Sequence, residues 1–207
     1  MDRDRSGSAA KAARTRILDA ASDLFYQQGI HAIGIDTVID RAGVAKASLY
    51  RHFRAKDDLT AAVLRQRDEL WRAWLTETVE AHATTPSQKL LAVFDALEEW
   101  FASEDFRGCG FINAAAEFPA PDHPVRIVVK EHKHAVTRYL SDLAREAGAR
   151  QPDGLASQLF LLMEGAIATA YVENATWPSE VARLAAAALL HDRRPLPPNG
   201  ERVAAPR

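Results

Sequence analysis

Residues 35–53 read IDTVIDRAGVAKASLYRHF, and this stretch decides the fold that we expect. It predicts a short helix over about residues 35–42, a turn at Gly43 and a second short helix over about residues 46–53. Glycine supplies the backbone freedom that a tight turn between steeply crossed helices requires. The apolar residues are spaced to bury together against an earlier helix; they are Val38, Ile39, Ala42, Val44 and Leu49, facing Ile17, Ala21 and Leu24.

The second short helix keeps a polar face outward. Its exposed side chains are expected to be Lys46, Ser48, Tyr50, Arg51 and His52. Hydrogen-bond donors of varied reach, together with an aromatic ring, suit a helix that lies in the major groove of DNA. Lys56, just before Asp57, is placed to meet a phosphate. A purely structural hairpin with an ordinary polar surface would show a similar pattern.

The charge is distributed unevenly along the chain. Residues 1–56 carry ten Lys and Arg against six Asp and Glu, a net charge of +4, whereas the 207-residue chain carries −2. A basic first quarter on an acidic remainder indicates a polyanionic partner at one end only. A chance fluctuation in surface charge would look the same.

Almost every other segment also reads as helix, so the fold class is predicted as all-α. Periodic apolar stretches are separated by Gly and Pro rather than interrupted by them. The predicted helices cover about residues 11–28, 56–82, 86–103, 106–118, 125–147 and 155–174, with a last helix after Pro178. The predicted domains are a disordered tail (1–10), a three-helix helix-turn-helix domain (11–56), a helical body (57–192) and a Pro-rich flexible tail (193–207).

Several classes of protein are excluded by composition. The single cysteine, Cys109, excludes an internal disulfide framework and a Cys-cluster metal site, and it is expected to be a small buried residue. His132 and His134 are two apart on a helix and point in different directions, so no metal site and no cofactor are predicted. No apolar run approaches the roughly 20 residues of a membrane span, and no secretory signal is visible. We therefore expect a cytoplasmic protein with no membrane partner.

The longest apolar segment indicates an oligomer. Residues 155–171 are apolar on more sides than one chain covers, and the small residues Gly165, Ala166, Thr169 and Ala170 permit close approach. The Ala-rich helix after Pro178 can lie beside this segment. Two helices from each of two chains would bury both apolar stripes around a two-fold axis. A wholly internal helix in a larger bundle is the alternative.

The stretch IDTVIDRAGVAKASLYRHFRAKDDL resembles the signature of the TetR family of bacterial transcriptional regulators. The match extends upstream through ARTRILDAASDLFYQQGIHAIGID, so it covers about residues 13–60 without a gap. The segments FRGCGFINAAAEFPAPDHPVR and VKEHKHAV are similar to the regulatory domains of some members. The resemblance implies a homodimer with two N-terminal DNA-binding heads and an all-helical ligand-binding body.

The resemblance also assigns DNA contacts. Lys46, Ser48, Tyr50, Arg51 and Lys56 fall on positions that usually contact bases or phosphates. Tyr50 and Lys56 would hold phosphates, Ser48 and Arg51 would meet base edges, and His52 would pack or contact the DNA backbone.

The chain departs from the family pattern at two of the positions expected to contact DNA. Gly34 and Ala45 stand where the family commonly has Thr or Ser. Glycine is an acceptable N-cap, but alanine costs about 1 kcal/mol relative to serine. The backbone N–H of Ala45 could still meet a phosphate, although the hydroxyl contact is absent.

The resemblance implies a ligand pocket in the body, and polar residues among large apolar ones indicate its lining. Asn113 and Glu117 share a helix face, His132 lies on an apolar stripe, and Glu164 lies midway along an apolar segment. The predicted lining of the pocket is Trp74, Phe94, Phe111, Asn113, His132, Met163 and Glu164.

Together with the resemblance, these features predict a ligand-responsive regulator that binds a double-stranded, pseudo-palindromic DNA operator as a homodimer. The resemblance alone implies that it is a repressor, released by a small molecule. The alternative is an all-helical small-molecule-binding protein or enzyme in which the helix-turn-helix is only structural. No Ser-His-Asp order, metal-ligand spacing, phosphate loop or catalytic carboxylate pair is visible, so we do not expect an enzyme.

Overall fold

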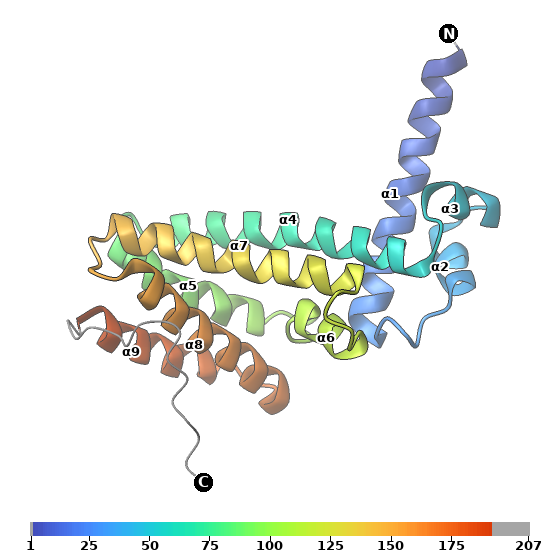
Figure 1. Cartoon of the computed structure of the whole chain (residues 1–207). Helices are drawn as coiled ribbons and strands as arrows, with labels where there is room; N and C mark the ends of the chain where they lie inside the picture. The colour runs from blue at the N-terminus through green and yellow to red at the C-terminus, as the bar shows by residue number, and fades with distance from the viewer. Residues whose placement is uncertain (1, 192–207) are drawn as a thin grey trace. The chain divides into compact units, whose positions relative to one another are not determined.

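The computed structural model describes residues 2–191, and the side chains of residues 11–191. Every regular element in this range is an α-helix, which confirms the predicted fold class (Figure 1). The helices are α1 (Asp2–Gln28), α2 (Ile35–Ala42), α3 (Lys46–His52), α4 (Lys56–His82), α5 (Pro86–Phe101), α6 (Gly110–Glu117), α7 (Pro124–Glu146), α8 (Pro152–Glu173) and α9 (Trp177–His191).

The chain forms two compact units. Among the described residues, the head unit contains residues 2–73 and 107–133, and the body unit contains residues 74–106 and 134–191. This division differs from the predicted boundary after residue 56, because α4 and α7 each contribute to both units and α6 belongs to the head unit.

The predicted terminal tails have different outcomes. Helix α1 begins at Asp2, so residues 2–10 of the expected tail belong to this helix. A helix that is already nucleated propagates at little cost through residues such as Ala9 and Ala10. The predicted tail over residues 193–207 lies outside the described range.

The helix-turn-helix forms as predicted. Ile17, Ala21, Val38 and Leu49 are fully buried where α2 and α3 pack on α1, while Val44 is only half-buried. Gly43 adopts φ +61°, and its N–H donates to the carbonyl of Asp40. This left-handed conformation ends α2 and lets α3 begin within three residues.

One predicted inward residue of α4 is wrong. The helical spacing of the apolar residues predicts that the inner face of this helix carries Leu59, Val63, Leu70, Trp74 and Leu75. Leu70 is instead 64% exposed. The inward stripe of the helix instead passes through Asp68 and Trp71, which contact His132 of α7. Leu70 was expected to be buried because it is apolar. Asp68 faces inward instead, because its carboxylate is paired with His132.

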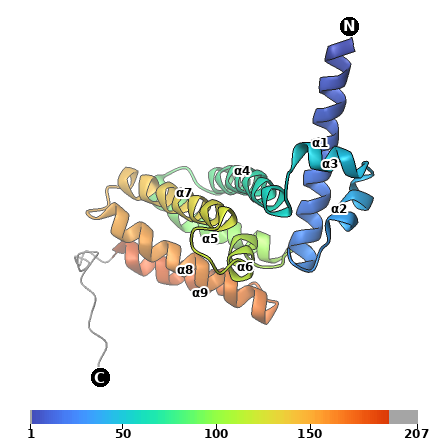
Figure 2. The same cartoon turned by 45° about the vertical axis from the view of Figure 1, so that its right-hand side comes forward.

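In the body unit, α5, α8 and α9 pack on one another, and α8 and α9 run side by side in both views (Figures 1 and 2). Their shared core includes Leu97, Leu159 and Ala186, which are fully buried. The start of α5 is fixed by a capping box, in which Thr85 accepts from the N–H of Gln88 and the Gln88 side chain reaches back to the N–H of Thr85.

Among the described helices, α8 is long and apolar enough to cross a membrane by length and composition alone. The sequence reading expected no such segment. The core helix of a soluble protein meets the same criteria, so this property of α8 is weak evidence for a membrane span.

Candidate nucleic-acid interface

The outward face of α3 carries the residues predicted to contact DNA. Lys46, Tyr50 and Arg51 are exposed, whereas Ser48 and His52 are half-buried. Arg51 donates to the Ser48 hydroxyl over 3.3 Å, so the two residues predicted to meet base edges lie together. The structure thus groups these side chains on a single short helix.

The helix beneath this face is anchored by apolar contacts and by two basic residues of α1. Leu49 is fully buried and Phe53 is 4% exposed. The Arg14 guanidinium lies 5.6 Å from the centre of the Phe53 ring, and Arg16 donates to the carbonyl of Gly43 over 3.4 Å. The sequence analysis did not identify Arg14 and Arg16 as functional residues. The feature that could have indicated them is their position in the basic first quarter of the chain.

The N-termini of α2 and α3 lack side-chain caps. Gly34 and Ala45 occupy the N-cap positions in extended conformations, and neither makes a side-chain capping bond. The first N–H groups of a helix have no partner within it, and they attract anions. Both helices therefore begin in a way that is compatible with phosphate contacts.

Two predicted cations already have contacts within the protein. Lys46 Nζ lies 2.9 Å from Oδ1 of Asp36 in the first turn of α2. The hydrogen bond to Asp36, and then its charge, raise the pKa of Lys46. Lys56 is half-buried, with its ammonium 5.9 Å from the centre of the Phe25 ring.

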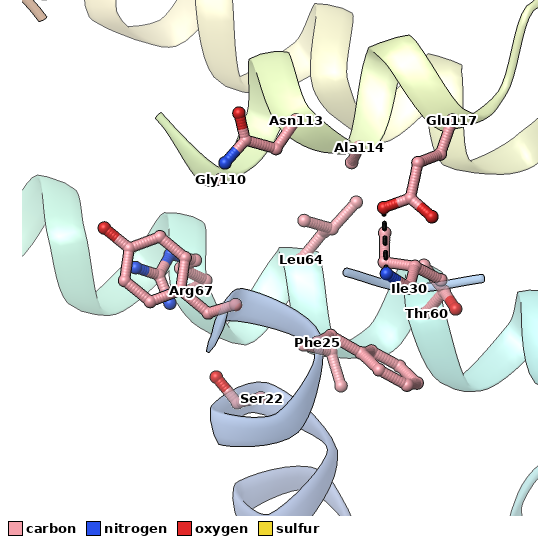
Figure 3. Close-up of a pocket in the computed structure, with 12 residues that line it drawn as sticks. Ser22, Phe25, Ile30, Thr60, Leu64, Arg67, Gly110, Asn113, Ala114 and Glu117 are labelled. Atoms are coloured by element: carbon pink, nitrogen blue, oxygen red, sulfur yellow. Dashed lines mark hydrogen bonds between the residues drawn. The ribbon is translucent and has the colours of Figure 1, made fainter. Parts of the chain in front are cut away.

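Helix α6 supports the helix-turn-helix through a carboxylate (Figure 3). Glu117 accepts hydrogen bonds from the backbone N–H groups of Ile30 and His31, over 2.8 and 2.6 Å, and lies 3.2 Å from Nδ1 of His31. These amides follow Gly29, whose φ of +90° ends α1. The sequence reading placed Glu117 only on a shared face with Asn113, because a contact across 86 residues leaves no local pattern.

The segment before α6 is tied to α1 through Tyr26. The Tyr26 hydroxyl accepts from the N–H of Arg107 and donates to the carbonyl of Gly108, each over 2.9 Å. The Arg67 guanidinium lies 3.6 Å from the centre of the Tyr26 ring. A Cβ at Gly110 would come within 3.1 Å of Arg67 Nε, so this close packing favours glycine.

A small pocket lies among α1, α4 and α6 in the head unit (Figure 3). Its lining includes Phe25 from α1, Leu64 and Arg67 from α4, and Asn113 and Glu117 from α6. Its volume of about 30 Å³ is on the order of one or two water molecules. Drug-sized ligands occupy roughly 300–1,000 Å³, so this pocket is too small for such a ligand as it stands.

His132 forms a buried cluster in the head unit. Its Nδ1 lies 2.7 Å from Oδ1 of Asp68, which also receives a bidentate pair of 2.8 Å bonds from Arg72. Its ring stacks on Phe111, with centroids 3.5 Å apart. Burial lowers the pKa of His132 to about 4, although Asp68 opposes this shift. The imidazole is therefore neutral near pH 7.

The predicted ligand-binding residues are divided between the two units. Phe111 stacks on His132, and Asn113 lines the small pocket and donates to the carbonyl of Arg107. The other four belong to the body unit: Phe94 and Met163 are each 1% exposed, Glu164 is half-buried, and the rings of Trp74 and Trp100 lie 6.3 Å apart.

A second surface, formed by α8 and α9, is apolar. It presents Leu161 and Val172 from α8, 70% and 79% exposed, and Leu184 from α9, 62% exposed. Single exposed apolar residues are normal on protein surfaces. Here several large ones lie on two helices that pack on each other, which favours a contact site on these helices.

No group of three or more potential metal ligands occurs among residues whose positions are described. Cys109 is buried, as predicted, and Lys133 Nζ lies 3.2 Å from its sulfur.

Comparison with known families gives two matches along the chain. Residues 17–63 match the family described as bacterial regulatory proteins, tetR family, and residues 86–186 match the tetracyclin repressor-like C-terminal domain. The first match contains α2 and α3, and the second spans α5, α6, α7 and α8.

Individual relatives agree with these matches. SCO4454, a TetR-family transcriptional regulator from Streptomyces coelicolor, is 34% identical, with a TM-score of 0.80 over 87% of this chain and 95% of that one. The HTH-type transcriptional regulator YjdC of Escherichia coli is 27% identical over 161 residues, covering 78% of this chain and 84% of YjdC. The HTH-type transcriptional activator FasR of Mycolicibacterium smegmatis is 33% identical over 136 residues, 65% of this chain and 60% of FasR.

Proposed function

Because the chain belongs to the TetR family of bacterial transcriptional regulators, we propose that it represses transcription from a pseudo-palindromic operator and is released by a small molecule. It is a helix-turn-helix transcriptional regulator and not an enzyme. The operator, the effector and the direction of regulation are the proposed parts.

The observation that carries the proposal is the polar face of α3 above its buried anchor. Arg51 and Ser48 meet base edges in the major groove, while Tyr50, Lys56 and the uncapped amides at Gly34 and Ala45 hold phosphates. Lys46 and His52 complete the contact surface. The buried Leu49 keeps these side chains in a fixed register on α1.

The apolar α8–α9 surface pairs with the same surface of a second copy. A two-fold interface uses the same patch on both subunits, and the exposed Leu161, Val172 and Leu184 supply apolar area for it. Two α3 helices then enter successive major grooves roughly 34–36 Å apart.

The effector contacts residues from the predicted set of Trp74, Phe94, Phe111, Asn113, His132, Met163 and Glu164. Its aromatic members favour an apolar or aromatic effector, and Asn113 and Glu164 provide polar recognition. The effector acts by binding the DNA-free state more tightly, with a coupling free energy of typically 1–3 kcal/mol. A protein with this role acts in the cytoplasm.

Selection of genomic fragments by the purified protein, repeated across salt concentrations, tests the proposal. We expect one enriched pseudo-palindrome whose affinity falls steeply with log salt. Arg51→Ala should weaken binding to this site about 10- to 100-fold, since a good base-edge pair contributes roughly 1–3 kcal/mol.

Arg138→Ala, which removes an exposed arginine from α7, is the matched control and should bind as the wild type does. Uniform weak binding to all fragments would contradict the proposal. In a transcription assay, the protein is added to a template that carries the enriched site. If transcription rises, the proposed DNA contact stands, but the protein is an activator rather than a repressor.

A further inference from the structure

Asp36 places a negative charge beside the first residue of α3. It lies in the first turn of α2, two residues after Gly34, and its side chain is 77% exposed. Its Oδ1 is 2.9 Å from the ammonium of Lys46, which is 60% exposed. The carboxylate therefore lies on the surface that the proposed function turns toward DNA phosphates.

This ion pair does little for folding. Exposed salt bridges contribute little to stability, because solvent screens them and two side chains lose conformational freedom. The N-terminus of α2 already favours an acidic residue through its helix dipole, so Asp36 is accommodated without Lys46. The main consequence of the pair is therefore electrostatic, since it neutralises a cation at the start of α3.

Any phosphate contact made by Lys46 must compete with this carboxylate. A lysine bound to phosphate releases counterions, which is the source of most sequence-independent affinity. A Lys46 that stays paired with Asp36 meets the DNA with its charge largely neutralised, and a Lys46 that leaves Asp36 exposes the carboxylate near the DNA backbone, where like charges repel. In non-specific DNA, no favourable contact of Asp36 offsets this weakened phosphate binding.

The edges of the bases can provide favourable contacts for both Asp36 and Lys46. A carboxylate accepts a hydrogen bond from the N4 amino group of cytosine, and a lysine donates to O6 and N7 of guanine. An Asp–Lys pair held together is thus matched to a base step rather than to a phosphate. We infer that Asp36 is a specificity-determining residue, which holds Lys46 away from phosphates and lowers affinity for non-specific DNA. This inference rests on the proposed function.

The test compares the full-length wild type with Asp36→Asn on a random-sequence duplex and on the enriched fragment, at several salt concentrations. We expect Asp36→Asn to bind the random duplex about threefold to tenfold more tightly, with a salt slope steeper by about two, because each half of the dimer frees one lysine. The ratio of specific to non-specific affinity should fall.

Asp40→Asn is the matched control, because it removes the same charge from an exposed position in the last turn of α2. It should change both affinities less than Asp36→Asn does. Equal effects would mean that net charge alone is responsible and would overturn the inference. Circular dichroism and the urea midpoint check that each variant folds.

A double variant separates the ion pair from simple repulsion. In a Lys46→Met background, Asp36→Asn should lose most of its effect on non-specific affinity, since no lysine remains to be released. An undiminished effect would overturn the inference. If the wild type binds the random duplex and Asp36→Asn binds it equally, only this inference fails. If the wild type binds neither duplex, the proposed function fails with it.

Discussion

Helices α3 and α5 begin in opposite ways. Helix α5 starts with Thr85, Pro86 and a reciprocal bond to Gln88, so its first amides are satisfied within the chain. Helix α3 starts at Ala45, whose methyl group accepts nothing, and its free amides are left for an outside partner. Because α6 and α8 also begin without a side-chain capping bond, the missing cap of α3 points to an outside partner only together with its exposed polar face.

The two units also expose different chemistry. Lys46, Tyr50 and Arg51 give α3 a polar, cationic surface over a small apolar anchor. The surface of α8 and α9 exposes leucine and valine beside a core that is already packed. Cationic donors suit a polyanion, and exposed aliphatic groups suit a second apolar surface. The difference predicts two separable partners, which mutations can distinguish.

The largest expected effect is on pairing. Leu161→Glu places a charge at a 70% exposed leucine of α8, so it should give a monomer by sedimentation. Operator affinity should fall about 10²–10⁴-fold, because the second half-site contact is no longer intramolecular.

Leu70→Glu is its control, since Leu70 is 64% exposed on α4 and belongs to the head unit rather than to α8 or α9. This variant should remain dimeric. A dimeric Leu161→Glu protein with wild-type affinity would contradict the assignment of the second copy to the α8–α9 surface.

Next in size is the anchor of α3. Leu49→Ala removes a fully buried side chain, so it should lower the free energy of unfolding of the head unit by about 2–5 kcal/mol. Arg51→Ala, two residues away and exposed, should change stability by less than about 0.5 kcal/mol while it weakens DNA binding. Urea denaturation checks both variants. Equal losses of stability would mean that Arg51 is part of the fold rather than of the DNA contact.

A third prediction concerns pH and the cluster around His132. The folded-state pKa of about 4 lies below the unfolded value of 6.5, so the neutral ring favours folding. This stabilisation is complete above pH 6.5 and is lost as the pH falls toward 4. It should decline by about 2 kcal/mol between pH 7.5 and pH 5.

The matched variant is His132→Gln, which has no titrating ring at this position. Urea midpoints should fall less steeply with decreasing pH for this variant than for the wild type. The same slope in both proteins would contradict the shifted pKa of His132.

The smallest effects concern the helix starts themselves. Thr85→Ala should destabilise the protein by about 1 kcal/mol, and Ala45→Ser should stabilise it by a similar amount, because each changes one N-cap. Thermal denaturation measures both. A null effect of Thr85→Ala would show that the capping box contributes nothing and would weaken the comparison of α3 with α5.

Much of the fold was predictable because its signals are local. Gly43 in a positive-φ turn, and Val38 and Leu49 at helical spacing, are patterns within a few residues. The inward role of Asp68 was missed because its partner His132 is 64 residues away. Partial burial of the Asp68 carboxylate is predictable only once that partner is known.

In the candidate site, too, residues on one helix were predictable from the sequence, whereas contacts between distant segments were not. The exposed face of α3 follows from helical periodicity, so Lys46, Tyr50 and Arg51 were found. The contacts of Glu117 with Ile30 and His31 join distant segments and leave no trace in spacing. The partnership of Asp36 with Lys46 also crosses from one helix to another, and only the structure joins them.

The central claim is that α3 contacts DNA and that α8 and α9 pair with a second copy of the chain. Hydroxyl-radical footprinting of the enriched fragment tests it most directly, because the pattern of protection reports both contacts in one experiment. The account predicts two protected stretches, related by pseudo-two-fold symmetry and centred about 10 base pairs apart, one for each α3 of a dimer. A single protected stretch, or protection without symmetry, would contradict the assignment of DNA to α3 and of a second copy to α8 and α9.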